Sequence, residues 1–393
     1  MKDTGLTKQS FFGYERANGT FGVRNHLVII SAVACINEVT RRIAEQVGGV
    51  PILHGEGCGR LPIDLMQIRH VLAGLGANPN VGAVLVVGLG CEGVQPKDLA
   101  ADIAASGKPV DVVVLQEMGG YTATLNKGIE IGTKLKKAIE GKDRVEVGLE
   151  HLTLGIKCGA SDATSGIVAN PAAGMAADLL IAAGGTSIFC ETTELIGAEH
   201  LLAQRAVCAE VGQKLLDTVS RLEREVERYG VDMRGGQPSP GNIAGGISSI
   251  EEKSLGAVCK AGRSQLQGVV GYGEVPPGKG LFFMDSPGRE MEVLTGLASA
   301  GAQLLLFTTG RGAPQGFPSA PVIKVCANAT TCSFLSEHID VDLSGAITGK
   351  QTLEEVALNV FRKILAVASG ELTKAEIIGY TETLDIYAPR LII

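Results

Sequence analysis

Short apolar runs alternate with longer amphipathic segments along most of the chain. Segments with apolar residues at helical spacing, among them residues 207–226 and 353–368, follow many of these runs. Strands that alternate with helices through short links predict an α/β fold with mostly parallel sheets and helices on both faces. The runs that predict buried strands are residues 27–33, 50–53, 81–87, 110–115, 152–156, 186–190, 281–284, 303–307 and 322–325.

A charged stretch at residues 140–146 separates the first four runs from the others. We therefore predict two α/β lobes, residues 1–146 and 147–393, each long enough to fold around its own core. Ligands of open parallel sheets bind beyond the carboxyl ends of the strands. Cysteine, glutamate, histidine, asparagine and arginine recur just after the predicted strands, so we expect a cleft at this edge.

The charge and the apolar content exclude two classes of partner. The formal net charge is −7, and no basic stripe with interleaved aromatic residues is present, so nucleic acid is not expected to bind. No apolar run reaches ~18 residues, and the N-terminus lacks the apolar core of a signal peptide. We therefore expect no membrane partner and a cytoplasmic protein.

The cysteines suggest a metal site rather than disulfide bonds. The chain has nine cysteines, an odd number, and no CxxC pair. Cys58, Cys91 and Cys158 each follow a predicted strand and have glycine neighbours, so they could converge on one metal ion. Thiolates suit iron or an iron–sulfur cluster, whereas carboxylates and histidines suit Fe(II) or Mn(II). Burial of each cysteine as a small apolar residue is the alternative interpretation. Further candidate ligands at strand ends are Glu92, Glu117, His54, Glu56, Glu194, Glu199 and His200.

The stretch CGASDATSGIVANPAAG at residues 158–174 has the composition of a reactive turn. Ser161 and Asp162 are short hydrogen-bonding groups that can bind a substrate or shape the loop. Asn170 and Pro171 predict the start of a helix whose unpaired N–H groups face the loop. We expect Ser161, Asp162 and Asn170 to contact the substrate.

Glu194, His200 and Lys253 are the candidate catalytic acids and bases. Glu194 ends the polar run ETTE, and His200 follows it closely. Lys253 lies near the predicted start of a helix, where a solvated surface charge is the alternative interpretation. Either Glu194 or Lys253 can accept a proton from a substrate, and the sequence leaves the choice between them open.

Two further pairs of residues are candidates for binding the substrate, and the second pair, Arg311 and Lys324, is a candidate for binding its carboxylate. Arg24 and Asn25 end a glycine-containing segment near the N-terminus, and Arg311 lies in the motif FTTGRG before Lys324 on the next predicted strand. Arginine and lysine bind carboxylates through charge-assisted hydrogen bonds. A buried salt bridge explains Arg311 and Lys324 equally well.

The sequence GLGCEG at residues 88–93 matches the pattern GxGxxG only formally. It follows the third predicted strand and places a thiol and an anion where a pyrophosphate would bind. Dinucleotide binding is therefore not expected, and a contact of Cys91 or Glu92 with a metal ion or substrate fits better.

Taken together, ten segments resemble the altronate/galactarate dehydratase family, which includes the large subunit of sulfolactate sulfo-lyase. They occur in family order over roughly residues 11–330, and Gly159-Ala160 departs from the glycine pair that is usual after the family's cysteine. The matching segments are GYERANGTFGVRN, HGEGCG, VGLGCE, QEMGG, KCGASDATSGIVANPAAG, ETTELIGAEHLLAQRAV, PSPGNIAGG, EEKSLGAVCKAG, LFTTGRG and PVIKVCAN.

The resemblance implies a metal-dependent lyase that dehydrates a sugar acid, an altronate-like aldonate or an aldarate, to a 2-keto-3-deoxy acid. The small N-terminal domain of full-length members is absent, which implies an oligomeric split enzyme whose small subunit is a separate chain. The second interpretation is a sulfolactate sulfo-lyase large subunit that releases sulfite and pyruvate. A non-catalytic subunit that binds a sugar acid is an alternative of another class.

Overall fold

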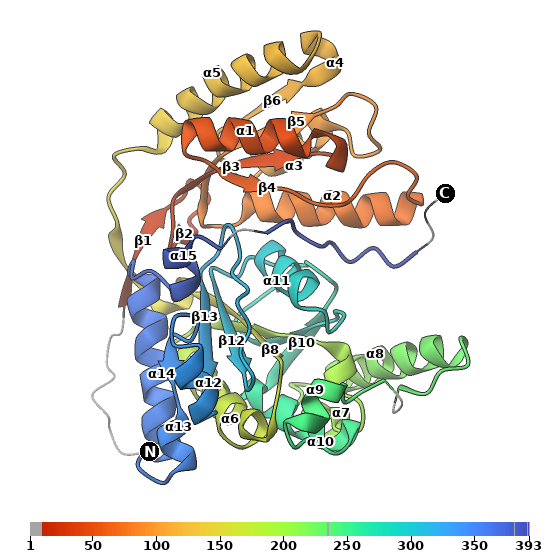
Figure 1. Ribbon diagram of the computed structural model, residues 1–393, viewed down its shortest axis with the longest axis vertical. Helices are drawn as coiled ribbons and strands as arrows, with labels where there is room; N and C mark the ends of the chain where they lie inside the picture. Colours follow the sequence, from red (N-terminus) through yellow and green to blue (C-terminus); the bar gives the residue numbers. More distant parts are fainter. Residues whose placement is uncertain (1–9, 234–235, 381, 391, 393) are drawn as a thin grey trace.

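The computed structural model describes residues 10–233, 236–380, 382–390 and 392, and the described strands form three sheets (Figure 1). The largest sheet has seven strands in the order β10-β11-β9-β8-β12-β13-β14, and every neighbouring pair in it is parallel. Its strands are β8 (Thr153–Gly159), β9 (Thr186–Phe189), β10 (Leu266–Val270), β11 (Gly280–Met284), β12 (Leu304–Thr309), β13 (Val322–Cys326) and β14 (Val341–Asp342).

A second parallel sheet has four strands in the order β4-β3-β5-β6. These strands are β3 (His26–Ser31), β4 (Val50–Ile52), β5 (Val81–Gly88) and β6 (Val110–Val114). All residues of β5 are buried, as expected for an apolar run in a sheet covered on both faces. The prediction of an α/β fold with two lobes and mostly parallel sheets is confirmed.

A small antiparallel sheet was not predicted from the sequence. It consists of β1 (Ser10–Glu15) between β2 (Phe21–Gly22) and β7 (Val145–Gly148). The pairing of β1 with β7 brings the two ends of the first lobe together. The division of the chain at residues 146 and 147 remains a prediction.

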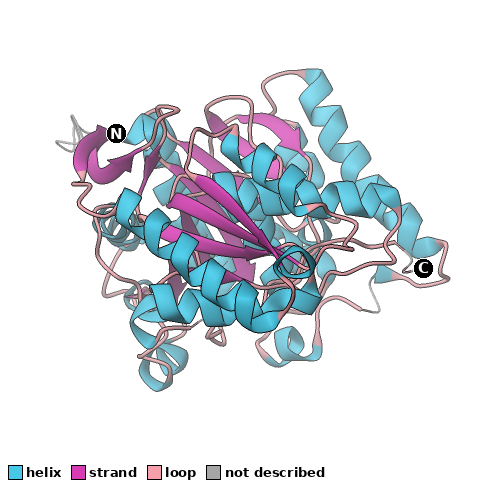
Figure 2. Ribbon diagram, turned by 90° about the horizontal axis from the view of Figure 1, so that it is seen from above, coloured by secondary structure: helices cyan, strands magenta, loops and turns pink. Residues whose placement is uncertain are grey.

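Helices lie on both sides of the strands, as Figure 2 shows from above. The longer helices are α1 (Asn37–Val47), α2 (Pro62–Ala77), α3 (Pro96–Ala104), α5 (Tyr121–Ile139), α6 (Asn170–Ala182), α8 (Ala209–Glu227), α10 (Ile250–Val258), α11 (Glu290–Ser299) and α14 (Leu353–Ala368). Shorter α-helices are α4 (Leu115–Met118), α7 (Glu199–Ala203), α9 (Pro240–Ala244), α12 (Ala329–Phe334), α13 (Ser344–Ile347) and α15 (Lys374–Ile378).

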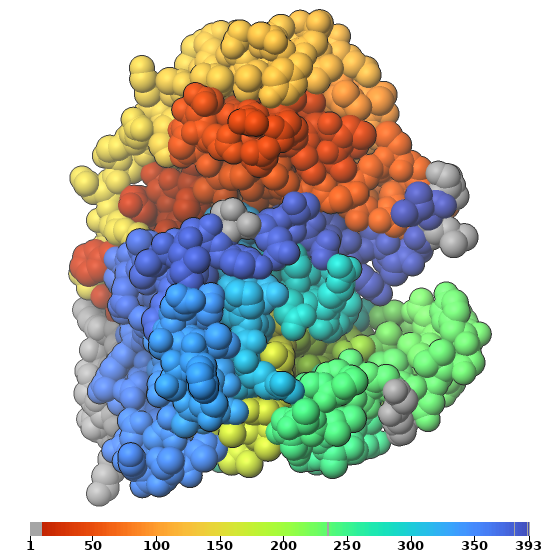
Figure 3. Space-filling view, in the orientation of Figure 1, coloured from red at the N-terminus to blue at the C-terminus, as the bar shows by residue number. Residues whose placement is uncertain are grey.

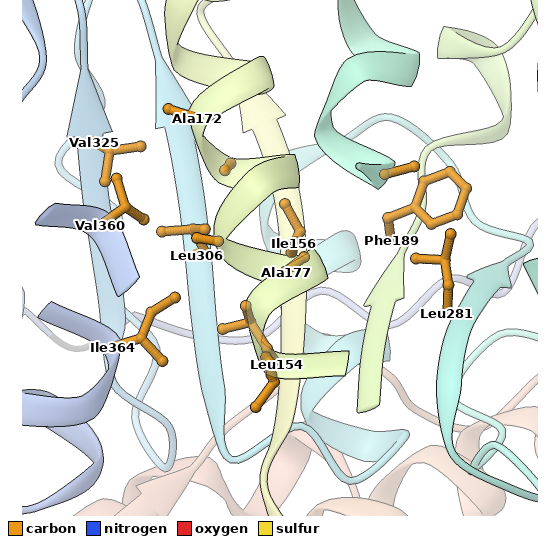
Figure 4. Packing of buried hydrophobic residues seen from close by; sticks show 14 of the residues in the cluster. Leu154, Ile156, Ala172, Ala177, Phe189, Leu281, Leu306, Val325, Val360 and Ile364 are labelled. Atoms are coloured by element: carbon orange, nitrogen blue, oxygen red, sulfur yellow. The ribbon is translucent and has the colours of Figure 1, made fainter. Parts of the chain in front are cut away.

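One face of the large sheet packs against α6 and α14. Figure 4 shows Ala177 of α6 beside Ile156 of β8, and these residues belong to one core cluster with Ala172 and Leu154. The small side chains of α6 let this helix approach the sheet closely, so its position above β8 is fixed by dense packing.

The opposite face of the large sheet shares a core with the four-stranded sheet. Helices α2 and α11 contact each other in this core, which also contains Leu384 and Ile386 from the C-terminal segment. The C-terminal segment therefore packs with residues of the first lobe as well as the second.

The helix after β8 begins earlier than predicted. The sequence indicated a start at Asn170, but helical turns begin at Ala163 and pass through a π-helix, Ser165–Ala169, into α6. The N–H groups at Asn170 therefore do not form a free helix end, and this prediction is wrong. The helical segment Ser165–Ala182 is long and apolar enough to span a membrane, but just over half of it is buried inside the protein, which is typical of a core helix.

Candidate functional site

The carboxyl ends of β8 and β9 bring a thiol and two carboxylates together. Cys158 lies in β8, whereas the two glutamates follow β9. Glu191 directly precedes the short 3₁₀ helix η4 (Thr192–Glu194), and Glu194 is the last residue of that helix. The N–H group of Cys158 donates to Oε2 of Glu191 over 2.9 Å, and its Sγ lies 2.6 Å from Oε2 of Glu194. The adjacent parallel strands thus place side chains that are distant in the sequence in direct contact.

Glu191 holds an unusual backbone conformation. Its φ is 79°, in the left-handed region that residues other than glycine rarely adopt. The N–H group of Glu191 donates to Oγ of Ser286 over 3.0 Å, which fixes the turn after β9. Such strain is typical of functional sites, because the surrounding structure must hold it in place.

Lys260 lies at the centre of this group. It belongs to the 3₁₀ helix η6 (Cys259–Ala261), and its Nζ is 3.1 Å from Sγ of Cys158 and 3.1 Å from Oε2 of Glu194. The same Nζ also forms a close ion pair with Oε2 of Glu191. Because all four side chains are buried, their charges interact more strongly than charges at the surface do.

The surroundings of the two carboxylates shift their pKa values in opposite directions. Burial, reinforced by Glu194, raises the pKa of Glu191 above its ordinary value. Burial would also raise the pKa of Glu194, but Lys260 and Lys253 lower it to about 2. Burial and Glu194 raise the pKa of the Cys158 thiol well above its ordinary value. The group therefore contains a neutral thiol and an ionised Glu194 at neutral pH.

Cys158, Glu191 and Glu194 form a buried group that could bind a metal ion, since their ligand atoms lie within 4.8 Å of one another. One buried oxygen of Glu191, Oε1, has no hydrogen-bond partner. However, the ammonium of Lys260 contacts all three side chains. A metal ion and this ammonium do not fit between the same three atoms together.

Lys253 connects the group to a pocket. Its Nζ lies 3.3 Å from Oε1 of Glu194 and donates to Oε1 of Gln237 over 2.7 Å. The adjoining pocket has a volume of about 290 Å³. Figure 3 shows the surface hollowed above the green residues, with yellow residues visible at the base of the hollow. The pocket is lined by Cys158, Ser161, Asp162, Ala163, Ser165, Gly166, Ile167, Asn170, Glu194, Ile247, Glu252, Lys253, Leu255, Gly256 and Ala257.

The loop after β8 forms one wall of the pocket. Ala160 has a φ of 48°, and its carbonyl accepts hydrogen bonds from the N–H groups of Gly310 and Arg311. Asp162 accepts from Thr164 Oγ1 over 2.6 Å and from Asn328 Nδ2 over 2.8 Å. Asp162 therefore shapes the loop with hydrogen bonds that use both of its oxygens.

Six of the predicted site residues lie around this one pocket: Cys158, Ser161, Asp162, Asn170, Glu194 and Lys253. Asn170 is held from both sides, because it donates to the carbonyl of Gly256 over 3.0 Å and accepts from Thr308 Oγ1 over 2.5 Å. His200 lies on α7, is exposed and is not among the residues that line the pocket.

Four other predicted substrate-binding residues are engaged in contacts within the chain. Arg24 forms an ion pair with Glu376 over 2.7 Å, and Asn25 accepts from Arg16. Arg311 donates to the carbonyl of Gly241 over 2.9 Å. Lys324 donates to the carbonyls of residues 314 and 315, and burial lowers its pKa to about 8. None of these four residues is among those that line the pocket.

The other predicted metal ligands lie at the carboxyl edge of the four-stranded sheet. Sγ of Cys58 is 3.9 Å from the carbonyl oxygen of Cys91, and both cysteines are exposed. Glu92 accepts hydrogen bonds from the N–H groups of the preceding turn, whereas Glu117 forms an exposed ion pair with Lys97 over 2.7 Å. In the described part of the chain, these residues form no group of three or more ligands with Cys158.

Glu191 and Lys260 belong to the buried group, and neither was selected as a site residue from the sequence. Glu191 stands in the same polar run as Glu194, so the sequence indicates that the two residues are close together, but it does not indicate the strained turn at Glu191. Lys260 follows Lys253 by seven residues, which is two helical turns and places both lysines on one side of their segment. That spacing was the available signal.

The fold and the site together define an α/β enzyme with buried acid–base groups at the carboxyl edge of a parallel sheet. Comparison with family models then identifies the family. Residues 149–388 match the model described as D-galactarate/Altronate dehydratase, C-terminal, and residues 13–140 match D-galactarate dehydratase/Altronate hydrolase, second domain. The chain belongs to the D-galactarate/altronate dehydratase family and is a carbon–oxygen lyase.

Individual relatives agree with this assignment. The chain is 37% identical to (2R)-sulfolactate sulfo-lyase subunit beta of Chromohalobacter salexigens, over 96% of this chain and 97% of the relative. It is 36% identical to altronate dehydratase of Bacillus subtilis, over 94% of this chain and 76% of the relative. Galactarate dehydratase (L-threo-forming) of Escherichia coli is 34% identical over 93% and 74% of the two chains. The predicted family resemblance is confirmed.

Proposed function

We propose that the chain dehydrates a sugar acid, an altronate-like aldonate or an aldarate, to a 2-keto-3-deoxy acid. The C–H bond next to the carboxylate breaks, the hydroxyl on the following carbon leaves as water, and the resulting enol becomes the ketone. The observation that carries this proposal is the contact of Lys253 with Glu194, 3.3 Å apart, at a pocket with a hydrogen-bonding wall. Such a reaction needs one group that accepts and returns protons.

Lys253 is the better of the two candidate bases. A carboxylate with a pKa of about 2, as in Glu194, holds a proton too weakly to remove one from carbon. Lys253 in its neutral form can take the proton, and Glu194 then stabilises the ammonium that results. Glu194 thus acts as the positioning and charge-balancing partner of the base.

The wall of the pocket suits the rest of a polyhydroxylated substrate. Ser161, Ser165 and Asn170, whose side chains carry hydroxyl and amide groups, line the same pocket as Lys253. Hydrogen bonds to several substrate hydroxyls would orient the α-hydrogen toward Lys253, and such orientation accounts for much of the rate in reactions of bound substrates.

Release of sulfite from sulfolactate is the second candidate function. It is favoured by the 37% identity to the sulfo-lyase subunit over nearly the full length of both chains. The same removal of an α-proton would expel sulfite instead of hydroxide and leave pyruvate. The non-catalytic binding subunit remains the alternative of another class, which measurement of turnover separates from both.

A separate small subunit is part of the proposal, together with an oligomeric, cytoplasmic enzyme. Support comes from the sulfo-lyase relative, which is named as a subunit. A small partner that covers the pocket would exclude water and strengthen the interactions of charged groups inside it.

The metal expected from the family resemblance, Fe(II) or Mn(II), stays a prediction, as does an iron–sulfur cluster. Its test is the iron and manganese content of anaerobically purified protein in which Cys58, Cys91 or Cys158 is replaced by serine. Unchanged metal content in all three variants would rule out a site at these cysteines.

The functional test is a panel of aldonates, aldarates and sulfolactate, assayed for 2-keto acid and for sulfite. The assays use the chain alone and with candidate small subunits, in the presence of Fe(II) or Mn(II) and without oxygen. Formation of a 2-keto-3-deoxy acid supports the dehydratase, and sulfite supports the second candidate. Binding of a sugar acid without turnover in any combination would contradict both.

A further inference from the structure

The centre of the group formed by Cys158, Glu191 and Glu194 already contains a cation. The Nζ atom of Lys260 is within 3.1 Å of both Sγ of Cys158 and Oε2 of Glu194, and it also pairs with Glu191. These are the same three side chains whose ligand atoms lie close enough together to hold one metal ion. The lysine therefore makes the contacts that a metal ion at this point would make.

Burial makes it difficult for a metal ion to displace the ammonium of Lys260. The side chains of Lys260, Glu191 and Glu194 are 1%, 1% and 8% exposed, so the ammonium has no nearby solvent into which to withdraw. The backbone around Lys260 is also fixed, because its helix η6 packs against α6. A side chain held this firmly competes effectively with a dissolved ion.

The remaining charges also disfavour a second cation. Oε1 of Glu194 faces Lys253 at 3.3 Å, and Oε1 of Glu191 faces Lys157 at 3.8 Å. Both carboxylates are thus already paired with ammonium groups on their two sides. A divalent ion added to this group would meet the buried side chains of Lys260 and Lys157 as well as its ligands.

We propose that the Lys260 ammonium is the resident cation of the Cys158–Glu191–Glu194 group and holds these side chains in place of a metal ion. A metal ion binds this group only when the amine of Lys260 has been removed. The proposal goes beyond the lyase function, because it concerns how the site is assembled and does not depend on which substrate is used.

The test is the binding of Co²⁺, whose bond to a cysteine thiolate produces an absorption band that reports directly on Cys158. The wild-type chain and the variants Lys260→Ala and Lys260→Ser are titrated with Co²⁺ without oxygen. We expect no thiolate–cobalt band in the wild-type chain, and a band with one Co²⁺ per chain in both variants. Replacement of Cys158 by serine in the Lys260→Ala variant should abolish it.

Lys253→Ala is the matched control. Lys253 contacts Oε1 of Glu194 but not Cys158 or Glu191, so its removal should leave Lys260 in place and give no band. If the Lys260 variants fold only with Co²⁺, this dependence on the metal supports the proposal. A thiolate–cobalt band in the wild-type chain overturns it, and so do folded Lys260 variants that show no band. If neither variant folds, the wild-type titration alone decides the question.

Discussion

Sγ of Cys158 lies 2.6 Å from Oε2 of Glu194, although the two residues are 36 positions apart in the chain. The thiol donates its hydrogen to a carboxylate that is also paired with Lys260 and Lys253. These side chains come from three segments: β8, the turn after β9, and the helical segment of α10 and η6 that contains both lysines. The contact therefore depends on the arrangement of all three segments.

The Cys158 thiol should be unreactive in the native protein. Burial and Glu194 raise its pKa well above the ordinary value, so almost no thiolate is present near pH 8. We expect iodoacetamide to modify the exposed Cys58 and Cys91 quickly and Cys158 only after unfolding. Mass spectrometry of peptides from native and urea-treated protein measures this difference. Modification of Cys158 at the rate of Cys58 in the native chain would show that the thiol is accessible and ionised.

Ala160 holds a left-handed conformation that glycine adopts at lower cost. Its φ of 48° is disfavoured for alanine by ~1–2 kcal/mol, part of which the greater freedom of glycine in the unfolded chain offsets. Ala160→Gly should therefore increase the free energy of unfolding in urea by ~0.5–1 kcal/mol.

Ala163→Gly is the control for this substitution, because Ala163 lies in a helical turn and the change should destabilise the protein by ~1 kcal/mol. Equal destabilisation by both substitutions would mean that the backbone at Ala160 carries no strain.

His54 should make the protein sensitive to mild acid. It is buried, its Nε2 lies 2.8 Å from the carbonyl of Ser31, and its Nδ1 accepts from the N–H of Glu56. Burial lowers its pKa to about 4, so the folded state stays neutral while the unfolded chain takes up a proton below pH ~6.5. Stability is therefore lost as the pH falls from ~6.5 toward 4.

The corresponding measurement is urea unfolding at pH 7 and pH 5. From these pKa values we expect His54 to account for a loss of ~2 kcal/mol between the two pH values. The variant His54→Gln should lose less stability than the wild-type chain by about that amount. An identical pH dependence in the two proteins would show that His54 is protonated in the folded state.

The sequence was most informative where the hydrophobic pattern alone determines structure. The run at residues 81–87 forms β5, because a strand buried on both faces is apolar throughout. The segment at residues 353–368 forms α14, because a helix buried on one face has apolar residues at helical spacing. The strand β1 was not predicted, since its partner β7 lies more than a hundred residues later in the chain. Long-range pairing of short strands leaves little local signal.

The candidate site was predicted only in part, because some of its residues are recognisable from the local sequence and others only from the fold. The loop after β8 was recognisable by its small polar residues, and Glu194 and Lys253 by their types. Lys260 was not, because a lysine inside an apolar segment resembles a surface residue until the fold buries it. The proximity of Cys158 to Glu194 follows from the pairing of β8 with β9, which a sequence does not specify by itself.

The central claim, that Lys253 removes the α-proton, is tested by exchange of the substrate's α-hydrogen with deuterium from D₂O, followed by NMR. The substrate and any small subunit are those found by the activity panel. Lys253→Met should reduce exchange and kcat by ~10²–10⁴-fold, the usual contribution of a general base. Lys214→Met is the control, since Lys214 donates to the carbonyl of Val269 outside the pocket. Exchange at the wild-type rate in Lys253→Met would contradict the account.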